Sequence, residues 1–229
     1  MNKKIINLFN LLLLITLSTL VFSSIAIPTS QNQDNDIVLI TGFKPFDVYD
    51  INPSEQITIE LNNTIFQNYT IKGYVLPVNY TAAPAKMKQL INTFDPVMII
   101  ALGLAGNAET IQVETLGVNL RINPEQPFPL LTLRTVNRTG PWIQKATYDI
   151  PKILSNIKKE EIPVEQSYSA GLYLCNAILY ETLLFESASK QMIPIGFIHV
   201  PQLNTQHPNG MPLDDMIRSV HVAINAQLH

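Results

Sequence analysis

The sequence has little of what disulfide-stapled, nucleic-acid-binding or disordered proteins need. Its 229 residues include one cysteine, so an internal disulfide is impossible and cysteine-rich zinc modules are excluded. Lysine and arginine total 15 against 18 acidic residues, and this net charge of −3 argues against nucleic acid as a partner. Only 14% of the residues are charged and 46% are apolar, which excludes a disordered chain. The composition is therefore that of a folded protein with enough apolar residues for a hydrophobic core.

The first 26 residues have the layout of a secretory signal peptide. Two lysines precede a mostly apolar stretch at residues 8–22, and Ser24-Ile25-Ala26 provides a small-x-small cleavage site. A retained membrane anchor is the alternative, but the apolar stretch is short and contains several polar residues. We therefore expect residues 1–26 to be removed and 27–229 to form a single domain. That domain is expected in the secreted or lumenal secretory and endolysosomal compartments, without stable membrane association.

Four Asn-x-Ser/Thr sequons agree with a eukaryotic secretory route and predict a glycoprotein. They begin at Asn62, Asn68, Asn79 and Asn137. In an asparagine-rich chain sequons also arise by chance, so they only support the prediction of export.

Short apolar runs alternate with segments of helical spacing through the rest of the chain. Strands are predicted at residues 37–40, 69–78, 97–103, 111–118, 164–169 and 195–200, and helices at 54–61, 81–94, 150–160, 172–189 and 213–228. Residues 119–141 are rich in proline and asparagine and predict a long loop with one extended piece near Leu130. The alternation indicates an α/β fold, a three-layer α/β/α open sandwich with a mostly parallel, twisted sheet.

Polar side chains lie near strand ends, where sheets of this kind bind ligands. Cys175 falls in the first turn of a predicted helix, where backbone N–H groups and the helix dipole favour a thiolate. His199 ends a predicted strand and is a suitable base for a thiol. Glu114 lies in an apolar stretch, where a buried carboxylate needs a partner such as an imidazole N–H. Together they suggest a site for nucleophilic catalysis.

Each of these residues also has a simpler interpretation. Cys175 could be a small core residue, His199 a hydrogen-bonded residue at a strand end, and Glu114 a solvent-facing residue on an edge strand. A zinc site formed by Cys175, His199 and His207 is disfavoured, because the chain has no compact pair of ligands.

Several motifs resemble those of the pyroglutamyl peptidase I family, also called pyrrolidone-carboxylate peptidases. Gly42-Phe43-Lys44-Pro45-Phe46 with Asn52-Pro53-Ser54 is similar to the opening motif of that family. The run Ser169-Ala170-Gly171-Leu172-Tyr173-Leu174-Cys175-Asn176 resembles its cysteine motif, and Gly196-Phe197-Ile198-His199-Val200-Pro201 resembles its histidine motif. The acid falls at Glu114, and the similarity runs from about Asp36 to the C-terminus.

The resemblance implies a cysteine peptidase that hydrolyses an N-terminal pyroglutamyl residue from peptides, with neither a metal nor another cofactor. It makes Cys175 the nucleophile, His199 the base and later acid, and Glu114 the residue that orients His199. It also implies a set of substrate-binding residues, which are Phe43, Phe46, Asn52, Leu104, Tyr173 and Leu174. The oligomeric state is left open, a homo-oligomer included.

The chain departs from the family pattern at positions that bear on rate and substrate breadth. The family usually has a lysine or arginine where Thr115 stands, and its further arginines fall at Ala108 and Pro124. The sequence leaves open whether Arg121 replaces one of them. The alternative functions are therefore a secreted, catalytically weakened peptide-binding homologue and a thiol hydrolase that acts on another acyl group.

Overall fold

The computed structural model describes residues 36–122, 132–188 and 192–228, and all of these belong to one compact unit. The predicted signal peptide at residues 1–26, Pro124 and the extended piece expected near Leu130 lie outside the described residues. Among the residues that are described, no helix is both long enough and apolar enough to cross a membrane.

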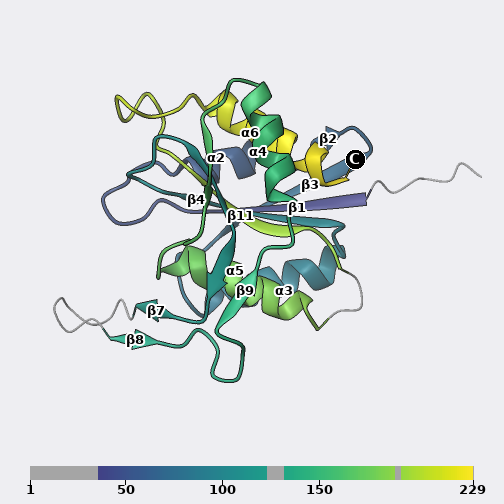
Figure 1. The fold of residues 1–229 in the computed structure, drawn as a ribbon, viewed down its shortest axis with the longest axis vertical. Coiled ribbons are helices and arrows are strands. Elements are labelled where there is room, and N and C mark those ends of the chain that lie inside the picture. Colours follow the sequence, from purple (N-terminus) through teal and green to yellow (C-terminus); the bar gives the residue numbers. More distant parts are fainter. Residues whose placement is uncertain (1–35, 123–131, 189–191, 229) are drawn as a thin grey trace, which may run out of the picture. The chain divides into compact units, whose positions relative to one another are not determined.

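A seven-stranded sheet in the order β10-β5-β11-β4-β1-β3-β2 lies at the centre of the fold (Figure 1). Its strands are β1 (Asp36–Phe43), β2 (Ile65–Phe66), β3 (Tyr69–Leu76), β4 (Met98–Leu104), β5 (Ile111–Glu114), β10 (Val164–Ser167) and β11 (Ile195–Val200). The prediction of a mostly parallel sheet is confirmed, since β3, β1, β4 and β11 pair in parallel. However, β5 is antiparallel to β11, and β10 is parallel to β5. β10 therefore ends at the edge of the sheet opposite to the one at which β4 and β11 end.

Helices cover both faces of this sheet and complete the predicted three layers (Figure 1). One face packs against α2 (Pro53–Leu61), α4 (Ile150–Lys159) and α6 (Leu213–Leu228), and the other against α3 (Ala82–Phe94) and α5 (Leu174–Glu186). Side chains alternate between the two faces along each strand. On β11, for example, Phe197 belongs to the core on the α3 and α5 side, and Ile198 to the core on the opposite side.

The segment after β5 differs most from the expected pattern. The continuous strand predicted over residues 111–118 is wrong, because β6 (Leu116–Val118) leaves the main sheet and pairs with β9 (Ile143–Lys145). Thr115 joins the two sheets: its N–H donates to Ser167 at 2.8 Å and its carbonyl accepts from Ala146 at 2.9 Å. A second small pair, β7 (Arg121–Ile122) with β8 (Leu133–Arg134), lies within the predicted loop.

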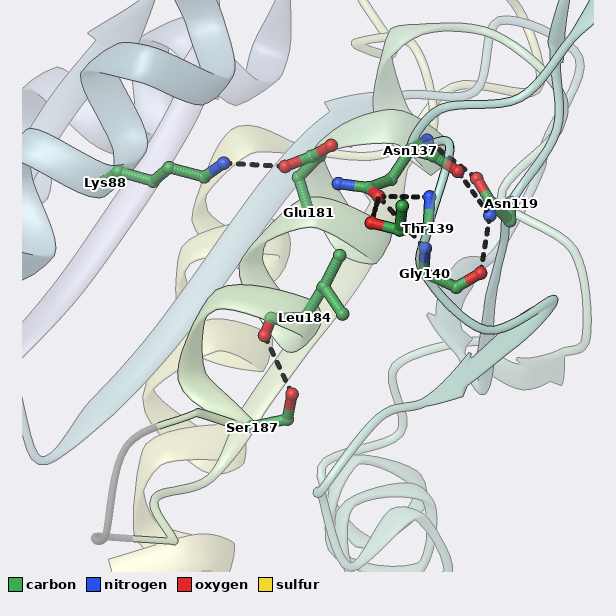
Figure 2. A network of polar contacts seen from close by, with 8 residues as sticks. All are labelled: Lys88, Asn119, Asn137, Thr139, Gly140, Glu181, Leu184 and Ser187. Carbon is green, nitrogen blue, oxygen red and sulfur yellow. Dashed lines mark hydrogen bonds and ion pairs between the residues drawn. The ribbon is translucent and has the colours of Figure 1, made fainter.

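Side-chain amides hold this segment in place, as Figure 2 shows. Asn119 donates to the carbonyls of Asn137 at 2.8 Å and Gly140 at 3.1 Å, and accepts from the Asn137 N–H at 2.8 Å. The Asn137 side chain in turn accepts from the Gly140 N–H at 3.0 Å. On the same side of the sheet, the ion pair of Lys88 with Glu181 at 2.7 Å joins α3 to α5. These contacts fix the surroundings of α5, the helix that carries Cys175.

β10 and α5 are both shorter than predicted, so the irregular segment between them is longer. β10 ends at Ser167 rather than residue 169, and α5 begins at Leu174 rather than 172. Gly171 has φ of 77°, a left-handed conformation that glycine adopts readily. The Leu172 carbonyl accepts from the Ile122 N–H at 2.8 Å, outside the helix.

Candidate active site

Three strands present their residues to the same face of the sheet, beneath the start of α5. Glu114 of β5 is paired with Phe197 of β11, and His199 is paired with Gly103 of β4. Since alternate residues share a face, Glu114, His199 and Gly103 all point to the side on which Phe197 packs against α5. Residues 85 positions apart in the sequence therefore become diagonal neighbours.

Glu114 and His199 form a buried pair. The Nδ1 atom of His199 lies 2.7 Å from Oε1 of Glu114, and the two residues are 7% and 0% exposed. The Phe197 ring contacts the imidazole at a tilt, with 4.8 Å between ring centroids. Glu114 therefore does not face solvent, and a proton on Nδ1 leaves Nε2 as the second functional atom of the ring.

Cys175 is the second residue of α5 and completes the arrangement. The helix starts without a side-chain cap from Tyr173, so its first turn presents backbone N–H groups beside the thiol. The Cys175 side chain is half-buried and lies close enough to the His199 ring to influence its pKa. Gly103 makes this approach possible, since a Cβ atom at that position would lie 3.0 Å from Sγ. The sequence did not reveal this role of Gly103.

The surroundings favour a positive charge on His199. Burial by itself lowers the pKa of the imidazole, but the charge and hydrogen bond of Cys175, together with the hydrogen bond and charge of Glu114, outweigh it. Their sum raises the pKa of His199 from 6.5 to about 9. At neutral pH the ring can therefore hold a proton next to Sγ, available for a leaving group.

Asn176 positions the start of α5 and is a second residue whose role the sequence did not reveal. Its side chain is fully buried, accepts from the Val118 N–H at 2.8 Å, and donates to the carbonyls of Val118 at 2.9 Å and Leu120 at 2.8 Å. A polar residue directly after the cysteine, followed by the apolar run Ala177-Ile178-Leu179, was the available signal. These three bonds tie Cys175 to the β6–β7 segment.

Asn52, predicted as a substrate-binding residue, holds the loop between β1 and α2. It is fully buried, its carbonyl oxygen accepts from the N–H and the hydroxyl of Ser54, and its amide donates to Lys44. The Ser54 hydroxyl accepts from the Phe43 N–H at 3.1 Å. The Asn-Pro-Ser motif thus caps α2 and fixes the loop that contains Phe46.

The loops after β1, β4 and β11 meet at the carboxyl edge of these strands. The Phe46 ring packs edge-on against Tyr49 with 5.6 Å between centroids, and Tyr49 fills the space that a side chain at Gly106 would need. Gln202, after β11, donates to the Gly106 carbonyl at 2.8 Å. Gly106 therefore links the loops after β1 and β11, whereas the end of β10, also expected at this edge, lies at the opposite one.

The remaining predicted substrate-binding residues lie at different depths. Phe43 and Leu174 are buried in the same core cluster on the α5 side. Leu104 is the last residue of β4 and is buried, whereas Tyr173 is 56% exposed at the start of α5. The structure brings Phe43 and Leu174 into one cluster with Cys175 packed against it.

The alternative zinc site is not assembled in the described part of the chain. No group of three His, Cys, Asp or Glu side chains there is arranged to hold a metal ion. His207 lies in an exposed turn, where its Nδ1 accepts from the Asn209 N–H at 3.2 Å.

Comparison with known proteins adds independent findings. A family model described as pyroglutamyl peptidase matches residues 36–229. A pyrrolidone-carboxylate peptidase of Halalkalibacterium halodurans is 32% identical over 197 residues, covering 82% of this chain and 98% of that protein. The solved structure of pyrrolidone carboxyl peptidase from Thermococcus litoralis has a TM-score of 0.79 at 31% identity, covering 84% of this chain and 93% of that one. The structure of the Pyrococcus furiosus enzyme gives 0.78 at 29% identity, with 84% and 98% coverage.

Proposed function

The chain belongs to the pyroglutamyl peptidase family, and we propose that it is a cysteine peptidase that removes an N-terminal pyroglutamyl residue from peptides through Cys175, His199 and Glu114. The observation that carries the assignment of roles is the line of three side chains. The Glu114 carboxylate lies 2.7 Å from Nδ1 of His199, and Cys175 lies close enough to the same ring to raise its pKa. This order of acid, imidazole and thiol is the one that nucleophilic catalysis requires.

In this mechanism the Cys175 thiol transfers its proton to His199, the sulfur adds to the pyroglutamyl carbonyl carbon, and the carbonyl electron pair moves onto oxygen. The oxyanion collapses, the C–N bond breaks, and His199 transfers its proton to the departing peptide amine. Water then attacks the thioester with His199 as base, which releases pyroglutamate and restores the thiol. The Cys175 backbone N–H at the start of α5 is the first donor to the oxyanion. Glu114 orients His199 and stabilises its charged form.

The proposed substrate fits the character of the surrounding side chains. Pyroglutamate is an uncharged lactam without a free α-amine, so its binding requires apolar walls and a few hydrogen bonds rather than a counter-charge. The Phe43–Leu174 cluster beside Cys175 and the Phe46 ring of the neighbouring loop offer such walls. A free N-terminal glutamine would bring a charged amine into this environment and should be rejected.

The alternative function is a peptide-binding homologue with weakened catalysis. It is favoured by the departures from the family pattern, above all Thr115, which is buried and accepts a hydrogen bond from Gln166 at 3.0 Å where the family usually has a cation. A thiol hydrolase that acts on another acyl group is the third possibility. All three use the same fold; the second differs from the first in turnover, and the third differs in the acyl group that it cleaves.

One experiment separates these functions. The protein is assayed with a fluorogenic pyroglutamyl amide and the matching glutaminyl amide, before and after alkylation of its single thiol. We expect hydrolysis of the pyroglutamyl amide alone, abolished by alkylation and in Cys175→Ala, while the unfolding midpoint of the variant stays near that of the wild type. A pyroglutamyl peptide that raises the unfolding temperature without being cleaved would instead establish the binding homologue. Full activity in Cys175→Ala would refute the mechanism.

We also propose that the protein is exported and glycosylated. The support is the layout of residues 1–26 and the four sequons. Asn68 is exposed at the turn between β2 and β3, and no side-chain hydrogen bond involves it among the described residues. N-terminal sequencing of protein from its native source should find the chain starting near residue 27, and a glycosidase should shift its mobility. An intact Met1 without a glycan would overturn export and leave the peptidase assignment untouched.

A further inference from the structure

Tyr80 has a buried hydroxyl to which none of the described residues offers a hydrogen bond. The residue lies between β3 and α3, and its ring packs against the same core cluster as Cys175. Its hydroxyl oxygen is inaccessible to solvent and has no hydrogen-bond partner among the described residues. Buried polar groups are nearly always paired, so an unpaired phenol near a reactive thiol calls for a partner.

Arg121 lies against Tyr80 and connects it to the start of α5. The guanidinium carbon is 4.6 Å from the centroid of the Tyr80 ring, a cation–π contact. The chain on either side of Arg121 is anchored to α5: the Ile122 N–H donates to Leu172 at 2.8 Å, and the Leu120 carbonyl accepts from Asn176 at 2.8 Å. These two anchors flank Cys175 in the sequence, so the Arg121–Tyr80 pair lies near the start of α5, and Tyr80 is close enough to Cys175 to respond to its charge.

The charges around the phenol keep it a hydrogen-bond donor. Burial raises the pKa of Tyr80, the Arg121 cation lowers it, and negative charge on Cys175 and Tyr173 raises it again, with a net increase. The hydroxyl therefore keeps its proton at neutral pH. A nearby cation also polarises the O–H bond and strengthens it as a donor to an anion.

We propose that Tyr80 is a further catalytic residue, whose hydroxyl donates a hydrogen bond to the scissile carbonyl oxygen as Cys175 adds to the carbonyl carbon. The C–S bond forms, the carbonyl π pair becomes an oxyanion lone pair, and the Tyr80 proton stays on the phenol throughout. Arg121 is a positioning residue that holds the ring and supplies positive charge beside the oxyanion. The inference rests on the proposed peptidase function.

Tyr80→Phe removes only the hydroxyl and is the primary test. Tyr74→Phe is its matched control, because Tyr74 packs against the same core cluster and its ring contacts Phe94 at a tilt, with 5.4 Å between centroids. We expect Tyr80→Phe to lower kcat on a pyroglutamyl amide by roughly 10- to 100-fold with little change in KM, since the bond forms only with the developing anion. The control should retain wild-type kcat.

Two further readouts distinguish this role from a structural one. Alkylation of Cys175 by iodoacetamide forms no oxyanion, so its rate should be nearly unchanged in Tyr80→Phe. An aldehyde analogue of pyroglutamate forms a tetrahedral adduct with the thiol, so its affinity should fall about as much as kcat does.

Variants of Arg121 test the coupling. Arg121→Met should lower kcat, Arg121→Lys should restore part of it, and the Tyr80→Phe/Arg121→Met pair should lose less than the product of the single losses. Wild-type kcat in Tyr80→Phe would overturn the inference, as would equal losses in hydrolysis and alkylation. If the wild type is alkylated but hydrolyses no pyroglutamyl amide, the peptidase proposal fails as well, and this outcome is distinct from the other two.

Discussion

Replacing Gly103 with alanine should place a methyl group where no space exists for it. The new Cβ would lie 2.7 Å from Cζ of Phe197 and 3.0 Å from Sγ of Cys175. Ordinary contacts between such atoms are about 3.5–4.0 Å, so one or both neighbours must move by several tenths of an ångström. Phe197 is fully buried, whereas Cys175 is half-buried, so the thiol should yield more readily than the ring.

The displacement should lower both the stability of the protein and the rate of catalysis. Overpacking of this kind typically destabilises a protein by about 1–3 kcal/mol. A displacement of a reacting atom approaching 1 Å can lower the rate by on the order of 10²-fold. We therefore expect Gly103→Ala to remain folded at room temperature and to lose most of its kcat/KM for a pyroglutamyl amide.

The matched control is Gly196→Ala, in the neighbouring strand. Its Cβ would lie 2.3 Å from the Tyr148 ring on the opposite face of the sheet, away from Cys175. Both variants should lose stability in urea unfolding, but only Gly103→Ala should slow hydrolysis and thiol alkylation. Wild-type kcat/KM in Gly103→Ala, or an equal loss in both variants, would refute the reasoning.

Three other variants and conditions give separate tests. Because folding raises the pKa of His199 from 6.5 to about 9, its stabilisation should be complete below pH 6.5 and be lost as the pH rises through 9. This shift corresponds to on the order of 3 kcal/mol, and urea unfolding of wild type and His199→Gln at several pH values measures it. Glu114→Gln should retain partial activity with the alkaline limb of its pH–rate profile moved below that of the wild type, since a carboxylate that raises the pKa of His199 is gone; an unmoved limb would contradict this. Asn176→Ala should lower the thermal midpoint and kcat together, because its three bonds to the β6–β7 segment position α5, and unaltered values would exclude that role.

Local patterns predicted the elements of the main sheet well and its exceptions poorly. The apolar runs at β4 and β11, and the helical spacing of α3 and α6, correspond closely to the observed elements. At Thr115 the apolar alternation shifts by one position, from Ile111 and Val113 to Leu116 and Val118, but this shift does not reveal which strands the two halves pair with. The break arises from hydrogen bonds to Ser167 and Ala146, which lie far away in the sequence. The reversed direction of β5 and β10 has the same kind of origin.

Residue chemistry identified the candidate site, whereas its supporting contacts required three dimensions. Cys175, His199 and Glu114 stand out in the sequence because a thiol, an imidazole and a carboxylate near strand ends suggest catalysis. Gly103 and Tyr80 do not stand out. Gly103 matters because it leaves space for Cys175. Tyr80 matters because of its hydroxyl group, although in the sequence it resembles an ordinary core residue. Cys175 also reaches the site differently from expected: β10 ends at the other edge, and α5 brings the thiol over the face of the sheet.

The elements that hold the three side chains determine which part of the site should be disrupted first on heating. Glu114 and His199 are diagonal neighbours on paired strands, so their separation can change only if the β5–β11 ladder opens. Cys175 instead depends on the first turn of a helix, whose opening requires far fewer bonds to break. Amide hydrogen exchange should therefore be slow in β11 and faster at the start of α5. Partial inactivation on mild heating should follow the exchange of the helix amides, with the Glu114–His199 pair still intact.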